Sequence, residues 1–94
     1  MSNRNIRYDP ECDTAAELLG GYEAIDESLD AYLDALDREP RGFTVVECAW
    51  GRVRVIQTKP IGRVPALLWY FVLEANGDVL ITNVEKFEPT YPFA

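Results

Sequence analysis

The chain contains no histidine and only two cysteines, Cys12 and Cys48. The absence of imidazole excludes Ser-His-Asp and Cys-His nucleophilic centres, as well as every zinc site that needs a histidine ligand. Two thiols are also too few for a zinc site built from cysteine alone. Both cysteines lie in apolar or strand-like contexts, which predicts buried thiols and no disulfide framework. We therefore expect no metal site and no cofactor.

Long apolar runs are also absent. No run approaches the ~18 residues of a membrane-spanning helix, and the polar start, MSNRNIRYDPE, lacks the features of a signal peptide. We expect a soluble, cytoplasmic protein without a membrane contact. The length of 94 residues fits one small domain, which we predict to span residues 1–94 with flexible or docking ends at 1–10 and 87–94.

Basic residues are few, and their distribution is uneven. The chain has nine Lys and Arg against sixteen Asp and Glu, a net charge of −7. Residues 1–41 carry eleven acidic and four basic groups, which gives −7, whereas residues 42–94 carry five of each. An acidic total argues against nucleic-acid binding, but screening over ~8 Å at physiological salt lets a local basic cluster act independently. The stretch at 51–63, GRVRVIQTKPIGR, holds such a cluster: Arg52, Arg54, Lys59 and Arg63.

The order of predicted elements indicates an α+β fold. A short strand at 5–9 precedes a helix that begins with the capping-box pair Thr14 and Glu17. Two glycines separate it from a second helix at 21–37, whose apolar residues recur at steps of three and four. The period then changes to two, which predicts strands at 43–48, 52–57, 66–75 and 78–84. We therefore expect two N-terminal helices packed on an antiparallel sheet of about four strands.

The last two strands define a register. The run ALLWYFVLEA at 66–75 is apolar throughout, as in a central strand that is covered on both faces. Asn76 and Gly77 follow it and predict a two-residue type I′ hairpin. With those two residues at the centre of the turn, Lys86 lies opposite Leu67.

Alternation in the strand at 52–57 places Arg52 and Arg54 on one face and Val53 and Val55 on the other. One interpretation has the valines facing the helices and the arginines facing water. The other makes the open face of the sheet a cationic groove for phosphates, with Lys59 and Arg63 overhanging it from the next loop.

The arrangement "WGRVRV … LLWYFVLEANGDVLITNVEKFEPTYP" resembles the RelE/ParE toxin superfamily of toxin–antitoxin systems, in particular its HigB-like, phage-derived branch. The resemblance covers roughly residues 43–92, and the two preceding helices agree with it in order. It implies a RelE-like α+β domain, a cognate antitoxin as partner and, in most such members, ribosome-dependent cleavage of mRNA.

The same resemblance implies site residues. Arg52 and Arg54 match the basic strand pair of the RNA-cleaving members, Lys86 and Tyr91 match their C-terminal elements, and Arg63 stands for a further arginine. A 2′-hydroxyl attack needs proton-transfer groups and positive charge on the phosphate. Trp50 is a candidate for stacking on a base, and Lys59 for contact with the RNA backbone.

The alternative hypothesis is a small acidic inhibitor or immunity-type protein, because residues 9–37 carry ten acidic groups and no basic one. A cationic protein would then bind the helical surface through Glu23, Asp26, Asp30 and Asp34. A third alternative is an assembly subunit that docks through its aromatic tail, FEPTYPFA. The sequence leaves the oligomeric state open.

Overall fold

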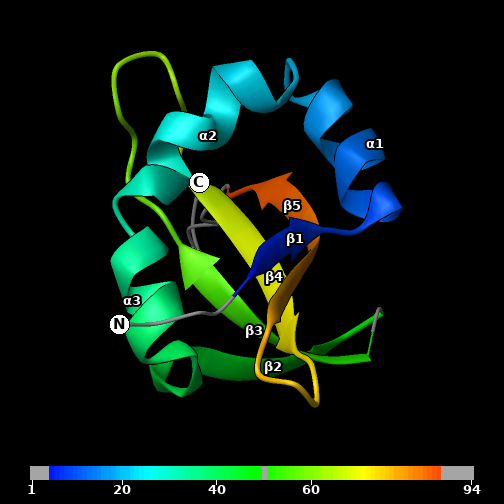
Figure 1. Ribbon diagram of the computed structural model, residues 1–94. Coiled ribbons are helices and arrows are strands. Elements are labelled where there is room, and N and C mark those ends of the chain that lie inside the picture. The colour runs from blue at the N-terminus through cyan, green and yellow to red at the C-terminus, as the bar shows by residue number, and fades with distance from the viewer. Residues whose placement is uncertain (1–4, 50, 88–94) are drawn as a thin grey trace, which may run out of the picture.

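The computed structural model describes residues 5–49 and 51–87, and these form helices on one face of a mixed sheet (Figure 1). The elements in chain order are β1 (Ile6–Tyr8), α1 (Pro10–Leu18), α2 (Tyr22–Asp30), α3 (Leu33–Arg38), the 3-10 helix η1 (Pro40–Gly42), β2 (Thr44–Cys48), β3 (Gly51–Gln57), β4 (Leu67–Leu73) and β5 (Val79–Lys86). The α+β class is confirmed. The described residues contain three α-helices, one more than predicted, and a sheet of five strands in place of about four, because the short strand near residues 5–9 joins it. No helix in these ranges is both long and apolar enough to cross a bilayer.

The fifth strand is β1, which lies at the edge of the sheet in the order β1-β5-β4-β3-β2. β1 runs parallel to β5, with Ile6 opposite Val79. The backbone of Asn5 reinforces this pairing, since its carbonyl accepts from Val79 N at 2.9 Å and its N–H donates to Asp78 Oδ1 at 3.1 Å. Residues 5–10 are thus built into the sheet and the start of α1. Residues 1–4 and 88–94 lie outside the described residues.

The first helix begins earlier than predicted. Asp9 is its N-cap and accepts from Glu11 N at 2.9 Å, and Pro10 occupies the first helical position. Aspartate at the cap followed by proline is a strong start signal, and it takes precedence over the Thr14–Glu17 capping box. The predicted helix at 21–37 is also interrupted, because the chain turns at residues 31–32 and divides it into α2 and α3.

The hydrophobic core lies between the helices and one face of the sheet. β4 is the central strand, as predicted, and its side chains Leu67, Trp69 and Phe71 are fully buried. The helices contribute Cys12, Ala16, Ile25, Leu29 and Leu36 to the same cluster. The indole Nε1 of Trp69 donates to Ser28 Oγ at 3.3 Å and so ties α2 to the sheet. Cys12 is buried and Cys48 half-buried, and both are free thiols.

The β4–β5 hairpin has the predicted register at its far end but a different turn. Lys86 lies opposite Leu67, which confirms that prediction. Glu74 and Asp78 close a three-residue loop, in which Gly77 N donates to Glu74 O and Gly77 has a φ of 92°. This is a type I turn followed by a left-handed glycine, so the predicted type I′ turn is wrong. A bulge between Tyr70 and Phe71 in the pairing compensates for the extra turn residue.

Candidate functional site

Arg52 and Arg54 share one face of β3, and it is the face that carries the helices. Arg54 pairs with Phe71, and Ile56 on the same face pairs with Trp69. Phe71 and Trp69 belong to the core beneath the helices. Val53 and Val55 therefore point to the opposite face. Both interpretations of the alternating strand are wrong on this point, because each placed the arginines away from the helices.

Arg54 can lie on the face of the sheet that carries the core because its side chain is only half-buried and reaches carbonyl groups beside η1. Its Nη1 donates to Phe43 O at 2.9 Å and to Arg41 O at 3.1 Å. Arg41 lies within η1, and Phe43 follows η1 directly. Hydrogen bonds from a cationic donor are about twice as strong as neutral ones. The half-buried guanidinium is thus held against η1 by two such bonds.

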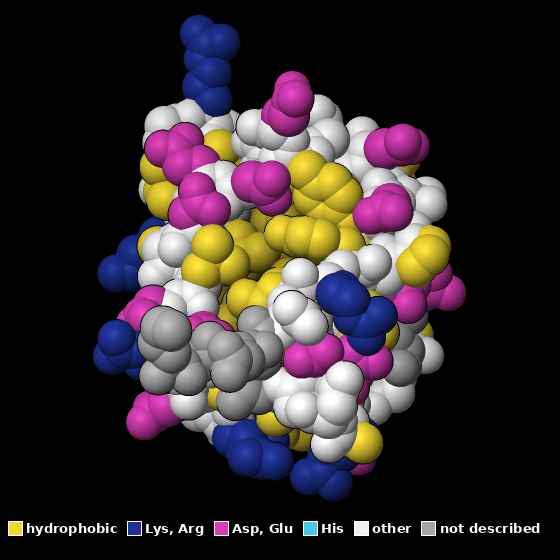
Figure 2. All heavy atoms as spheres, in the orientation of Figure 1, with side chains coloured by type: hydrophobic (Ala, Val, Ile, Leu, Met, Phe, Trp, Pro, Cys, Tyr) yellow, Lys and Arg dark blue, Asp and Glu magenta, His cyan; other side chains and the backbone are white. Residues whose placement is uncertain are grey.

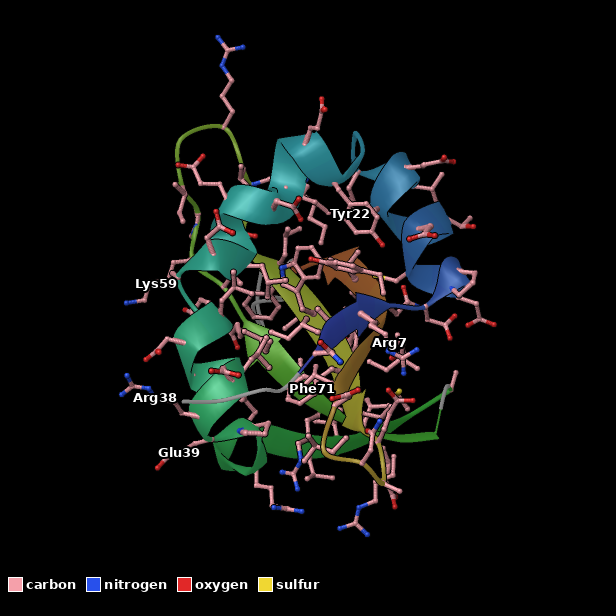
Figure 3. The ribbon with its side chains drawn as sticks, viewed as in Figure 1. Arg7, Tyr22, Arg38, Glu39, Lys59 and Phe71 are labelled. Atoms are coloured by element: carbon pink, nitrogen blue, oxygen red, sulfur yellow. The ribbon has the colours of Figure 1, made fainter. Side chains whose placement is uncertain are left out.

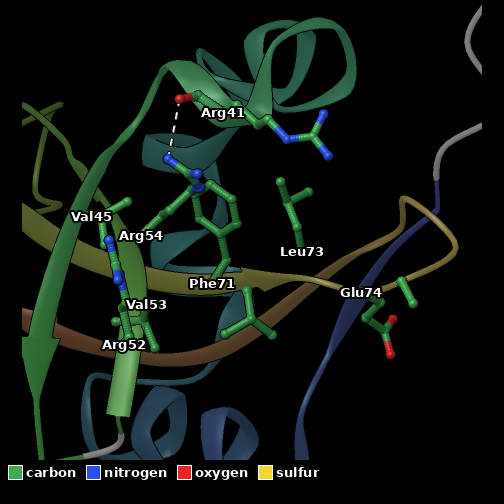
Figure 4. Close-up of a pocket in the computed structure, with 10 residues that line it drawn as sticks. Arg41, Val45, Arg52, Val53, Arg54, Phe71, Leu73 and Glu74 are labelled. Carbon is green, nitrogen blue, oxygen red and sulfur yellow. Dashed lines mark hydrogen bonds between the residues drawn. The ribbon is translucent and has the colours of Figure 1, made fainter.

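Around Arg54 the surface forms a cavity of about 440 Å³, here called the arginine pocket. Figure 4 shows Arg54 reaching from β3 to η1, with Arg41 above it and Arg52 beside Val45. The lining residues are Arg41, Val45, Arg52, Val53, Arg54, Phe71, Val72, Leu73, Glu74 and Ala75. Three guanidinium groups around an apolar floor form a site suited to a planar or tetrahedral anion.

Glu74 is the acidic member of the lining, and it is paired elsewhere. Its carboxylate accepts from the guanidinium of Arg7, which lies on β1. The hydrogen bond and the charge of Glu74 both raise the pKa of Arg7. The Glu74 charge is therefore largely offset by Arg7, and the pocket keeps an excess of positive charge.

The structure does not bring the predicted catalytic residues together. Arg54 lies level with Phe71 on β4, while Lys86 lies level with Leu67, four residues or roughly 13 Å further along the strand. Lys86 lines a separate groove against α1. Arg63 belongs to the loop between β3 and β4, at the Lys86 end of the sheet.

Lys59 lies in that same loop and points away from the body of the molecule (Figure 3). Lys59 and Arg63 are both exposed, and neither lines the arginine pocket. Trp50 and Tyr91 lie outside the described residues. The cationic groove that was predicted over residues 52–63 is thus divided between the two ends of β3.

Two residues near the pocket were missed from the sequence. Arg41 was not among the predicted site residues because it lies between Pro40 and Gly42, which are typical of the end of a helix. This segment nevertheless leads directly into β2, the strand that pairs with β3. Glu47 lies opposite Arg52 in the β2–β3 register, and it is the carboxylate that this pairing places beside the basic strand. Glu85, on β5, accepts from the Tyr70 hydroxyl at 2.5 Å.

The acidic residues of the alternative hypothesis lie on α2 and α3. Glu23, Asp30 and Asp34 are exposed, and Asp34 pairs with Arg38 at 3.1 Å. Asp26 differs from them, because its Oδ1 is inaccessible and has no hydrogen-bond partner among the described residues. Desolvation by burial and the neighbouring charge of Asp30 raise the pKa of the Asp26 carboxyl. This carboxylate is held in an environment that disfavours its charge.

We expect the Asp26→Asn variant to be more stable than the wild type at neutral pH. A carboxyl whose folded pKa is raised ionises first in the unfolded chain, so the wild type loses stability as pH rises from the ordinary to the raised pKa. Asparagine does not ionise, so the variant does not lose stability in this way. The difference in stability between the variant and the wild type should vanish at pH values below the ordinary pKa. Urea unfolding across a pH series measures it, with Asp34→Asn as an exposed control. Identical pH profiles for Asp26→Asn and the wild type would contradict the assignment.

Within residues 5–49 and 51–87, no cluster of three or more cysteine or acidic side chains could hold a metal ion. The charged groups at the site are the arginines of the pocket and the carboxylates of Glu47 and Glu74. In comparisons with known proteins, no family model, no curated protein and no solved structure matches this chain.

Proposed function

We propose that this protein binds RNA through the arginine pocket, as a diverged RelE/ParE-like protein. The observation that carries the proposal is that Arg41, Arg52 and Arg54, from two separate segments, line one cavity. Guanidinium groups bind phosphate through paired N–H donors. The uncharged floor beside them, which includes Phe71 and Leu73, suits the less polar parts of a nucleotide.

Single-stranded RNA is the ligand that fits the charge distribution. The acidic residues are concentrated on α1, α2 and α3, so a long duplex laid across the molecule would meet them. A single strand needs only a short basic track. Screening over ~8 Å separates the pocket electrostatically from the remote acidic groups.

In this proposal Lys86 has no role in the cleavage of RNA. Lys86 lies at the other end of β5 from the pocket. Glu47, opposite Arg52, is then the group placed to accept a proton from a 2′-hydroxyl. A ribosome would supply the remaining orientation, as the resemblance to RelE-type proteins implies.

The test is binding of a short single-stranded RNA, measured by fluorescence anisotropy over a range of salt concentrations. The Arg41→Gln/Arg52→Gln variant removes two exposed charges from the pocket. We expect it to weaken binding roughly tenfold and to reduce the salt slope by about 1.4, since each single-strand phosphate contact contributes ~0.7.

The matched control is Lys59→Gln/Arg63→Gln, which removes the same charge from the loop at the opposite end of β3. It should retain the wild-type slope. If both double variants weakened RNA binding equally, the affinity would depend only on the net charge of the protein. That result would contradict a binding site at the pocket. RNA integrity after induced expression in bacteria, compared with a Glu47→Gln variant, reports whether cleavage takes place.

A further inference from the structure

Glu74 is the acidic residue in the lining of the arginine pocket, and the β4–β5 loop fixes its backbone. The N–H of Glu74 donates to Asp78 O at 2.8 Å, and its carbonyl accepts from Gly77 N at 2.9 Å. Among the described residues, the β3–β4 ladder ends at the pair Arg54 and Phe71, although β4 continues beyond Phe71. Side chains from both faces of the sheet can therefore reach the cavity beyond this pair, and Glu74 is held at this open end.

Arg7 holds the carboxylate of Glu74 from outside the pocket. It lies on β1 and is not among the described residues that line the cavity. Its neighbour Ile6 packs against the core, so alternation along β1 directs Arg7 to the opposite face of the sheet. There its guanidinium pairs with the Glu74 carboxylate. Figure 4 shows the Glu74 side chain directed away from Arg52 and Arg54, so the ion pair both neutralises this carboxylate and keeps it turned from the arginines.

The loop that carries Glu74 also anchors β1. Asn5, which precedes β1, donates through its N–H to Asp78 Oδ1 at 3.1 Å, and its carbonyl accepts from Val79 N at 2.9 Å. Asp78 Oδ2 accepts from Asn76 Nδ2 at 3.1 Å, within the same loop. The position of Arg7 relative to Glu74 is thus set by backbone contacts between β1 and this loop as well as by the ion pair.

A free carboxylate at the Glu74 position would oppose RNA binding in two ways. Its charge would repel a phosphate, and its oxygens would accept hydrogen bonds from the guanidinium groups that the phosphate needs. One carboxylate matters here because the positive charge is local. On the face shown in Figure 2, Lys and Arg side chains lie at the lower end, where β2 and the β4–β5 loop lie in Figure 1, and acidic side chains lie above them over the helices.

We propose that Arg7 is a positioning residue for RNA binding, because its pairing with Glu74 keeps the donors of the pocket arginines available to phosphate. This inference rests on the function proposed above and extends it to β1. That strand contributes no described residue to the lining of the cavity. Arg7 therefore acts through Glu74 and not by contact with RNA.

A purely structural ion pair predicts a different result from a positioning role. The side chains of Arg7 and Glu74 are 55% and 30% exposed, and exposed pairs contribute little to stability. Arg7→Gln should therefore keep nearly the wild-type midpoint of urea unfolding. A loss of RNA affinity at unchanged stability separates positioning from a structural role.

The experiment is a double-mutant cycle on Arg7 and Glu74, measured as the affinity for a short single-stranded RNA by fluorescence anisotropy. We expect Arg7→Gln to weaken binding about threefold, within the range that exposed charge pairs allow, and Arg7→Lys to retain most of the affinity. Glu74→Gln should bind at least as tightly as the wild type. Once Glu74→Gln is present, adding Arg7→Gln should have almost no effect, because the carboxylate that Arg7 positions is gone. This double variant also keeps the net charge of the wild type.

Lys59→Gln is the matched control, since it removes one positive charge from the loop at the opposite end of β3. It should change the affinity much less than Arg7→Gln. If Arg7→Gln weakened binding equally with and without Glu74→Gln, Arg7 would act through its own charge, and the positioning role would be overturned. Weaker binding by Arg41→Gln/Arg52→Gln in the same series would then leave the pocket in place and remove only the role of Arg7. Unchanged binding by Arg41→Gln/Arg52→Gln would overturn the site and this role together.

Discussion

Trp69→Ala is expected to lower the free energy of unfolding by about 3–5 kcal/mol. The indole is fully buried at the centre of the sheet, where Trp69 lies between Ile56 on β3 and Val84 on β5. Alanine would leave a cavity where these strands meet the helices and would remove the hydrogen bond to Ser28. Small domains have a total stability of only about 5–15 kcal/mol, so the variant should be largely unfolded at moderate urea concentrations. Urea unfolding followed by far-UV circular dichroism measures the change.

Two controls separate cavity formation from the loss of the hydrogen bond. Trp69→Phe keeps most of the apolar volume, and Ser28 Oγ still donates to Ile25 O at 2.8 Å, so we expect a smaller loss than for alanine. Leu18→Ala changes a side chain that is 85% exposed and should alter stability by less than about 0.5 kcal/mol. A cost for Trp69→Ala that does not exceed that of Leu18→Ala would contradict the central position of Trp69.

Trp69 also illustrates what the sequence could predict. Residues 66–75 form the longest apolar run that is typical of a strand, and a run without alternation belongs at the centre of a sheet. That local signal depends on side-chain type alone, so β4 was predictable. The pairing of Lys86 with Leu67 agrees with the prediction because the bulge offsets the extra turn residue. The strand at residues 5–9 carried a comparable signal, but its parallel pairing with β5 depends on contacts across more than seventy residues.

The direction of the arginines was not predictable in the same way. Alternation shows that Arg52 and Arg54 share a face, but it does not show which face the helices cover. Apolar residues occur on both sides of β3, since Val53 is buried on one face and Ile56 on the other. The decisive feature is the break between α2 and α3 and the short η1 that follows, which together bring the carbonyls of Arg41 and Phe43 over Arg54.

Charges of opposite sign are separated on this small domain. The arginine pocket lies between β3, β4 and η1, whereas α1 and α2 carry acidic residues and no basic one. Because salt screens charges over ~8 Å, the pocket can present a positive potential although the net charge is −7. An acidic composition is therefore compatible with RNA binding when three arginines are gathered at one end of the sheet.

Arg54 couples the stability of the pocket to its ligand binding, and Arg54→Met should impair both. Methionine keeps part of the apolar stem but leaves the carbonyls of Arg41 and Phe43 without their cationic donor. Hydrogen bonds to charged groups contribute about 1.5–3 kcal/mol, and the loss should lie at the lower end because the site is partly solvated. RNA affinity should fall at least as far as in Arg41→Gln/Arg52→Gln, because the same change removes a charge and loosens η1. Urea unfolding and RNA anisotropy measure the two effects on one sample.

Arg54→Lys distinguishes the charge of this residue from its geometry. Both described hydrogen bonds use Nη1. In the proposed complex, Nε and Nη2 hold a phosphate in a bidentate manner. Lysine keeps the positive charge but has a single side-chain nitrogen. This nitrogen can bond to a backbone carbonyl or to the phosphate, but it cannot make the several simultaneous contacts of a guanidinium group. We therefore expect most of the stability to return while RNA binding stays weak. Full recovery of RNA affinity in Arg54→Lys would show that the pocket acts through charge alone, and the planar guanidinium would then have no part in recognition.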